Sequence, residues 1–257
     1  MRRKAFAARV WSKLVAFARE ERLLRRGDRI LAAVSGGPDS VCLAHYLRAM
    51  ARRKGFSVRL LHVHHGLRGG AADRDAAFVR DLGRQWGVPA FTAAAPVRTR
   101  GQGLEAAARK SRYRALTRAA RRLRCNKVAT GHQLDDQAET VLLHLLRGTR
   151  VSALAGIPPR RRLSGRIDLV RPILPLTRAE VLAYLEVHGL KCRHDRTNRD
   201  TRFTRNWIRS RVLPLLASRN PRIREHLAGI AAQVRRLKAG RAVKPRASQG
   251  RHKLPDL

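Results

Sequence analysis

Two short segments of this 257-residue chain combine residue types suited to phosphate and cation chemistry. The first is SGGPDS at residues 35–40, made of Ser35, Gly36, Gly37, Pro38, Asp39 and Ser40. Its glycines let the backbone approach a phosphate group, and a helix beginning here would add unpaired N–H groups and a partial positive charge. Asp39 fits such a loop if a divalent cation lies between its carboxylate and the phosphates. The alternative is a tight strand-to-helix turn with no ligand, since the segment matches neither GxxxxGK[ST] nor GxGxxG.

The second segment is GHQLDDQAET at residues 131–140. Asp136 and Glu139 lie three positions apart and Asp135 and Glu139 four apart, so a helix brings their carboxylates together at its start. Such a cluster could bind Mg²⁺ or an ammonium group. The alternative is that the helix dipole alone favours acids here. Because the whole chain has only 18 Asp and Glu residues, three within five positions favour a functional pocket.

Histidines and cysteines give weaker signals. Three histidines occur within residues 62–65 (HVHH), but an extended segment points alternate side chains to opposite faces, which argues against a metal site. Cys42, Cys125 and Cys192 are widely spaced and form no CxxC motif. They therefore predict a reducing compartment and no cysteine-based zinc or iron–sulfur centre.

The elements that must position these residues follow a strand–helix alternation. Apolar runs predict strands at residues 29–34, 57–63, 88–92, 126–130 and 168–173. Helical periodicity predicts helices at residues 5–25, 39–52, 71–86, 102–123, 134–147 and 177–188, the last with Thr177 as its N-cap. Strands separated by such helices predict an α/β fold with a parallel sheet covered by helices on both faces.

The pattern loosens in the second half of the chain. We expect a basic loop at residues 157–162, a further helix framed by Pro214 and Pro221, and a flexible basic tail from Ala239. The chain is thus divided into a catalytic domain at residues 1–217, with an N-terminal helix at 1–25, and a short basic helix with a tail at 218–257.

The charge balance predicts a polyanionic partner. Lys and Arg number 57 against 18 Asp and Glu, a formal net charge of +39. Coding bias can explain why arginine replaces lysine but not why acids are scarce, so nucleic acid is favoured over an anionic membrane. No apolar run approaches the ~20 residues that span a bilayer, which predicts a soluble protein with no membrane partner.

Five motifs in order resemble the tRNA(Ile)-lysidine synthetases, members of the PP-loop (N-type) ATP pyrophosphatases. They are SGGPDS, HVHHGLR, LEAAARKSRY, ATGHQLDDQAET and RFTRNWIR, within about residues 25–217. The resemblance implies a Rossmann-like sheet, a cytoplasmic C–N ligase and three substrates: ATP, free L-lysine and tRNA(Ile) with a CAU anticodon. ATP would adenylate C2–O of the wobble cytidine (position 34) and release pyrophosphate, after which the lysine ε-amine would attack C2 and release AMP, forming lysidine.

The same resemblance implies roles for individual residues. The 35–40 loop would hold the departing pyrophosphate with Mg²⁺ at Asp39. Asp136 and Glu139 would form the lysine pocket, with His132 beside the α-phosphate. Arg112 and Arg205 would counter charge at the adenylated intermediate.

Departures and alternatives remain at this point. A Trp-x-Glu-Asp-like stretch usual in the family is replaced by residues 192–195 (CRHD), which leaves its acidic role to Asp195 alone. Longer members carry C-terminal domains that help to select tRNA, and the basic segments 160–171, 191–211 and 235–253 are expected to contact the RNA backbone instead. A tRNA 2-thiolation enzyme and a non-catalytic RNA-binding protein on the same scaffold are the alternatives. The sequence leaves the oligomeric state open, and a homodimer is compatible with it.

Overall fold

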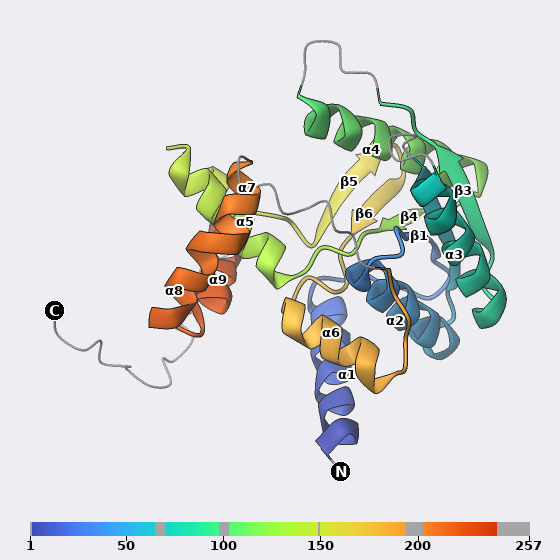
Figure 1. Cartoon of the computed structure of the whole chain (residues 1–257), viewed down its shortest axis with the longest axis horizontal. Helices are drawn as coiled ribbons and strands as arrows, with labels where there is room; N and C mark the ends of the chain where they lie inside the picture. Colours follow the sequence, from blue (N-terminus) through green and yellow to red (C-terminus); the bar gives the residue numbers. More distant parts are fainter. Residues whose placement is uncertain (1, 65–69, 98–102, 149, 194–202, 241–257) are drawn as a thin grey trace, which may run out of the picture.

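Six strands form a single sheet in the order β3-β2-β1-β4-β6-β5 (Figure 1). The computed structural model describes residues 2–64, 70–97, 103–148, 150–193 and 203–240. The strands are β1 (Arg29–Ala33), β2 (Ser57–His64), β3 (Ala90–Ala94), β4 (Lys127–Ala129), β5 (Arg160–Ser164) and β6 (Ile167–Val170). All neighbouring strands are parallel except β5 and β6, which are antiparallel. The predicted parallel α/β sheet is therefore confirmed.

The helices cover both faces of the sheet, and a third group lies to one side of it (Figure 1). One face is covered by α1 (Arg2–Glu20), α2 (Pro38–Lys54), α3 (Gly70–Trp86) and α6 (Arg178–Val187). The other face is covered by α4 (Leu104–Arg122). The third group contains α5 (Leu134–Leu146), the 3-10 helix η1 (Val151–Ala155), α7 (Thr204–Trp207), the π-helical turn η2 (Ile208–Val212), α8 (Leu213–Arg219) and α9 (Ile223–Lys238).

The order of the strands reverses between β1 and β4. The chain runs outward from β1 through β2 to β3, and then returns to place β4 on the opposite side of β1. Ligands of open α/β sheets bind outside the carboxyl ends of the strands at such a reversal. The SGGPDS loop follows β1 and the GHQLDD segment follows β4, so both predicted segments lie at this position.

The basic loop predicted at residues 157–162 is wrong for residues 160–162, because these residues belong to strand β5. They form an antiparallel edge strand that pairs with β6. Its side chains alternate: Arg161 and Leu163 are half-buried, whereas Arg160 and Arg162 are exposed and pair with Asp168. Arginine occupies both faces of this strand, which hid the period of two from the sequence pattern.

The C-terminal helices lie where the sequence predicted them, and the last one is longer than the short helix that was expected. The helix between Pro214 and Pro221 is α8, and the short basic helix expected after residue 217 is α9, with 16 residues. The apolar residues of α9 pack on α5 and η2 through Leu227 and Ala231. Residues 241–257 of the predicted tail lie outside the described residues. No helix in the described part of the chain is long and apolar enough to cross a membrane.

A buried ion pair joins the N-terminal segment to the centre of the sheet. Lys127 of β4 donates to Asp28 Oδ2 at 2.6 Å and to the carbonyl oxygen of Leu23 at 2.7 Å. The two charged side chains are only 5% and 6% exposed. Asn126 Nδ2 also donates to Asp28, at 2.8 Å. All three residues of β4 are buried, so the ammonium group of Lys127 needs buried partners. Asp28 and Leu23, which precede β1, supply them.

We expect the substitution Lys127→Met to lower the free energy of unfolding by about 3–5 kcal/mol, because it leaves the Asp28 carboxylate buried without its cation. Urea denaturation monitored by circular dichroism measures the change. The double variant Asp28→Asn/Lys127→Met removes both charges and should recover part of the loss.

The exposed ion pair between Arg3 and Glu186 supplies the matched control, since its side chains are 77% and 70% exposed. Arg3→Ala should change the free energy of unfolding by less than about 1 kcal/mol. A loss for Lys127→Met no greater than that of Arg3→Ala would contradict the structural role of the buried pair.

Candidate functional site

The SGGPDS loop connects β1 to α2, as predicted. Gly36 has a φ of +92°, a conformation that residues with a side chain rarely adopt, and Gly37 is the residue from which α2 begins. The Ser40 hydroxyl donates to the Gly37 carbonyl at 2.8 Å and accepts from the Ser35 N–H at 3.2 Å. Pro38 is buried at the first turn of the helix, where its missing N–H costs nothing. The loop is therefore held by its own two serines.

Gly131 brings the second segment against the first. A Cβ atom at this position would lie 3.0 Å from the carbonyl carbon and oxygen of Asp39 and 3.2 Å from the backbone nitrogen of Ser40. Only glycine allows this approach without a shift of the backbone. The end of β4 therefore packs directly on the start of α2.

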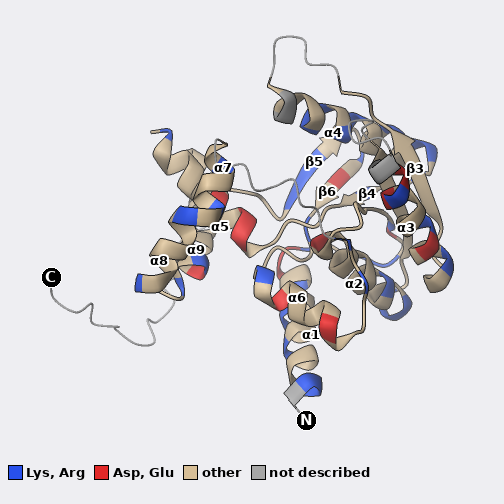
Figure 2. Cartoon of the chain, viewed as in Figure 1, with Lys and Arg blue, Asp and Glu red and all other residues tan. Residues whose placement is uncertain are grey.

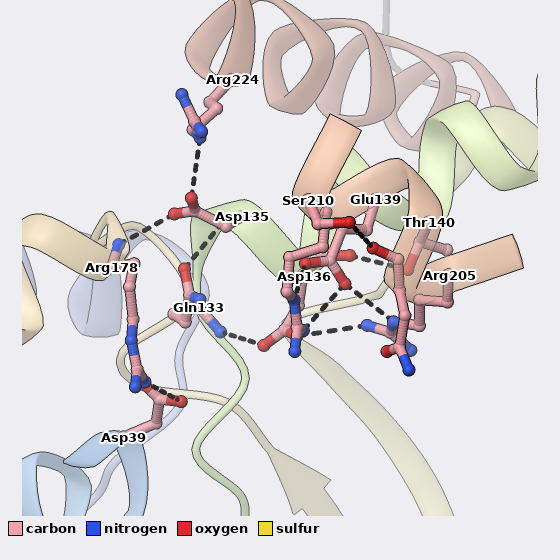
Figure 3. A network of polar contacts seen from close by, with 12 residues as sticks. Asp39, Gln133, Asp135, Asp136, Glu139, Thr140, Arg178, Arg205, Ser210 and Arg224 are labelled. Carbon is pink, nitrogen blue, oxygen red and sulfur yellow. Dashed lines mark hydrogen bonds and ion pairs between the residues drawn. The ribbon is translucent and has the colours of Figure 1, made fainter. Parts of the chain in front are cut away.

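The predicted carboxylates lie in the first turns of α5. Gln133 and Asp136 form a reciprocal cap: the Gln133 N–H donates to Asp136 Oδ2 at 3.0 Å, and Gln133 Oε1 accepts from the Asp135 N–H at 2.7 Å. This cap fixes the Asp136 side chain. Glu139 lies one turn further along and is 0% exposed. Figure 3 shows Asp136 and Glu139 on the same side of the helix.

Two arginines neutralise these carboxylates. Arg205 Nε donates to Glu139 Oε2 at 2.8 Å and its NH2 group to Asp136 Oδ1 at 3.1 Å (Figure 3). Arg209 Nε donates to Glu139 Oε1 at 2.6 Å, and its NH2 group donates to Glu139 Oε2 at 3.0 Å. The structure thus brings Arg205 to the predicted lysine pocket. Sequence reasoning missed Arg209, although its spacing of four from Arg205 would have placed both on one helical face.

Asp39 and Asp135 are joined by Arg178, which the sequence analysis did not identify. The NH1 group of Arg178 donates to both Asp39 oxygens, at 2.7 and 2.8 Å, and its backbone N–H donates to Asp135 Oδ2 at 2.8 Å (Figure 3). The other Asp135 oxygen accepts from Arg224 Nε at 2.7 Å. Asp135 therefore contacts α6 and α9 and does not share the cations of Asp136 and Glu139.

Burial raises the pKa of two carboxyl groups in this site. Burial and the Glu139 carboxylate raise the pKa of Asp136 to about 6, against the opposing charges of Arg205 and Arg209. Burial also raises the pKa of Asp39, although the guanidinium of Arg178 opposes it. Each carboxylate therefore depends on a nearby cation to keep its charge.

His132 lies among positive charges. Burial holds its pKa well below the usual value, and the guanidinium groups of Arg171, Arg109, Arg205 and Arg112 lower it further. Its Nδ1 atom lies 3.0 Å from the Thr130 hydroxyl. The imidazole is therefore neutral near pH 7. The structure thus brings the predicted residues Arg112 and His132 close enough to interact electrostatically.

Among the described residues, no group of three or more His, Cys, Asp or Glu side chains could hold a metal ion by itself. Mg²⁺ needs no such group when substrate phosphates supply most of its ligands, so the single carboxylate of Asp39 fits it. In the HVHH segment, His62 Nδ1 contacts the Val34 carbonyl oxygen at 3.1 Å and His64 Nε2 lies 3.2 Å from Asp73 Oδ1. Residues 65–68 and 194–202, with the predicted Asp195, lie outside the described residues.

Two curated proteins show what this chain resembles in sequence. A tRNA(Ile)-lysidine synthase of Symbiobacterium thermophilum is 46% identical over 200 residues, covering 77% of this chain and 41% of that protein. Another, of Dehalococcoides mccartyi, is 43% identical over 217 residues, covering 81% of this chain and 46% of that protein. The chain thus spans less than half the length of these two curated relatives.

A solved structure, the U34-tRNA thiolase NcsA of Methanococcus maripaludis with its [4Fe-4S] cluster, superimposes with a TM-score of 0.74 at 18% identity. The match covers 91% of this chain and 80% of the thiolase, and it shows a shared fold. The family model for the PP-loop domain matches residues 7–216, which include the SGGPDS loop, the carboxylates of α5 and the arginines of α7 and η2. The chain belongs to the PP-loop domain family.

Proposed function

We propose that this chain uses ATP to ligate free L-lysine to C2 of the wobble cytidine (position 34) of tRNA(Ile) with a CAU anticodon. The observation that carries the proposal is a pair of neighbouring carboxylates, half-buried Asp136 and buried Glu139, at the carboxyl end of the strand next to the SGGPDS loop. The names of relatives that match 77–81% of the chain support the same substrate pair. The reaction would proceed in two steps, first adenylation of C2–O with release of pyrophosphate, then attack by the lysine ε-amine with release of AMP.

In the first step the SGGPDS loop would bind the departing pyrophosphate through backbone N–H groups and the start of α2. Asp39 would hold Mg²⁺ in place of the Arg178 guanidinium that it now binds. Mg²⁺ would supply charge neutralisation for the phosphates. Arg178 would then be free to turn toward a phosphate, because its side chain is already 40% exposed.

In the second step the lysine amine must lose a proton before it attacks. A free ε-amine has a pKa of ~10.4, so the neutral form costs about 4.6 kcal/mol at pH 7. The pocket of Asp136 and Glu139 would bind the ammonium and help to take its proton. Glu139 has no exposed surface, and two guanidinium groups hold its charge. An incoming ammonium would therefore replace one of these cations in the pocket.

Arg112, Arg205 and His132 would act on the nucleotide. A neutral imidazole at residue 132 can hydrogen-bond an α-phosphate oxygen without carrying charge. Arg205 would leave the carboxylates when lysine enters, and with Arg112 it would counter the charge that develops at the adenylated intermediate.

The cysteines disfavour the thiolation alternative. Cys42 is buried on the α2 face of the sheet and Cys125 on the α4 face, and Cys192 follows α6. All three are free thiols. The sheet itself separates Cys42 from Cys125, so they cannot act together as ligands of one cluster or as a reactive pair.

The first test is isotope exchange between pyrophosphate and ATP. We expect exchange only when tRNA with a CAU anticodon is present, because the adenylate forms on the base. Labelled pyrophosphate incorporated into ATP measures the rate. Exchange with a small carboxylic acid in the absence of RNA would overturn the proposal.

The second test separates the two steps. We expect Asp136→Asn and Glu139→Gln to permit adenylation but to reduce incorporation of labelled lysine into tRNA by at least about 100-fold, because each removes negative charge from the ammonium pocket. Glu186→Gln, at the far end of α6, is the matched control and should retain full incorporation. Full product from both pocket variants would place the lysine site elsewhere.

The third test uses pH. Asp136 has a pKa of about 6, so its negative charge is lost as the pH falls through that value. Lysine stays cationic throughout, so its KM should rise by up to about tenfold between pH 8 and pH 5. The Asp136→Asn variant should lack this dependence. A KM that falls or stays constant in the unsubstituted protein would contradict the assignment of Asp136.

A further inference from the structure

Arg171 is a buried arginine that lies near His132 but belongs to neither the SGGPDS loop nor the carboxylate pocket. Arg171 directly follows β6 and is only 2% exposed. Its backbone N–H donates to the Pro159 carbonyl at 2.9 Å, and its NH1 group donates to the carbonyl oxygen of Pro158. Its guanidinium also forms a hydrogen bond with the side chain of Tyr113, and only its buried Nε atom has no hydrogen-bond partner. A buried guanidinium with an unused donor needs an explanation, because burial of an unsatisfied charged group is costly.

Further cations gather around Arg171. On α4, the half-buried ring of Tyr113 has the Cζ atoms of Arg109 and Arg161 each 5.1 Å from its centroid. Although burial alone would raise it, the charges of Arg109, Arg171 and Arg161 lower the pKa of Tyr113. Burial lowers the pKa of Arg171 itself. Tyr113 thus lies among three guanidinium groups that come from α4, β5 and the end of β6.

Carboxylates do not balance these charges in the part of the chain that the structure describes. Among the side chains that the structure describes, no carboxylate forms an ion pair with Arg161 or Arg171, and the nearby Asp168 pairs with Arg160 and Arg162 on the other face of β5. The Arg161 guanidinium donates to a backbone carbonyl instead. This cluster therefore has the charge and the free donor that an anion would satisfy.

The place of the cluster in the sheet indicates which anion it binds. The SGGPDS loop lies at the end of β1, whereas Arg171 lies at the end of β6, with β4 and His132 between them. The Thr130 N–H donates to the Val170 carbonyl, so the residue before Arg171 is tied to the segment that leads to His132. An RNA whose base reacts beside His132 would extend its backbone away from the ATP loop, toward β6.

We propose that Arg171 and Tyr113, flanked by Arg109 and Arg161, form a phosphate-binding site that holds the RNA backbone next to the reacting base. Arginine suits this role because its planar group donates two parallel hydrogen bonds to one phosphate. The site's link to a reacting base rests on the proposed function, but its affinity for RNA can be measured without catalysis. The triphosphate of ATP is the other source of the same chemistry, and the experiment separates the two.

The test compares equilibrium binding of two probes, an anticodon stem-loop RNA with a CAU anticodon and ATP, each without lysine. We expect Arg161→Ala and Arg171→Met to weaken binding of the RNA by about tenfold. Each variant should also reduce the slope of log K against log salt concentration by about 0.7. The dissociation constant for ATP should stay within about twofold. Arg171→Lys, which keeps the charge but not the planar group, should recover part of the affinity.

Arg84→Ala is the control, because Arg84 is an exposed arginine of α3, on the other face of the sheet from Tyr113. Arg84→Ala should keep the RNA affinity within about twofold. If Arg171→Met does not fold, as judged by circular dichroism, Arg161→Ala and Tyr113→Phe decide the question.

Unchanged RNA affinity and salt slope in Arg161→Ala and Tyr113→Phe would overturn the proposal. Loss of ATP affinity with unchanged RNA affinity would also overturn it and assign the site to the nucleotide. If the unsubstituted protein forms no lysidine but binds the RNA, and the variants lose RNA affinity, the result supports this site and refutes the proposed function. The two failures are therefore distinguishable.

Discussion

A carboxylate with no exposed surface keeps its charge only when cations surround it, and Glu139 is such a group. Its two partners, Arg205 and Arg209, come from a segment more than sixty residues further along the chain. The interaction therefore ties α7 and η2 to α5, which in turn supports the packing of α9. Without these arginines, two neighbouring carboxylates in this position would have no cationic partner, which is strongly unfavourable. The folding of the C-terminal helices and the chemistry of the site thus depend on the same contact.

The scarcity of acids takes on a specific meaning in the folded chain. Figure 2 shows few Asp and Glu residues among the Lys and Arg residues of this chain, whose net charge is +39. Several of these acids pair with particular cations. They serve to position arginines and lysines: Asp28 with Lys127, Asp39 with Arg178, Asp135 with Arg224, Asp136 and Glu139 with Arg205 and Arg209, Asp168 with Arg160 and Arg162, and Glu180 with Lys13. Most remaining positive charge lies on the surface, where it can attract a polyanion.

The reversal of strand order between β1 and β4 separates two kinds of chemistry. The loop after β1 offers backbone groups and one carboxylate, which suit phosphates and a divalent cation. The segments after β4 and β6 offer a neutral histidine, paired carboxylates and unbalanced arginines, which suit an ammonium group and a nucleic acid backbone. Because Gly131 lets these segments touch at Asp39, the two groups of residues lie directly against each other.

The sequence alone determined the strand–helix order and the place of the two glycine-containing segments, and it predicted a polyanionic partner, because hydrophobic periodicity, glycine positions and charge are local or additive properties. It placed Asp136 and Glu139 side by side at the start of one helix, since a spacing of three on a helix fixes their proximity. It did not show that β5 is a strand, because arginine on both faces conceals the alternation. The partners Arg178, Arg209 and Arg224 and the cluster around Arg171 were decided only by the tertiary structure. Those contacts join residues far apart in the chain, and burial, which gives them their energetic weight, arises only when the helices pack.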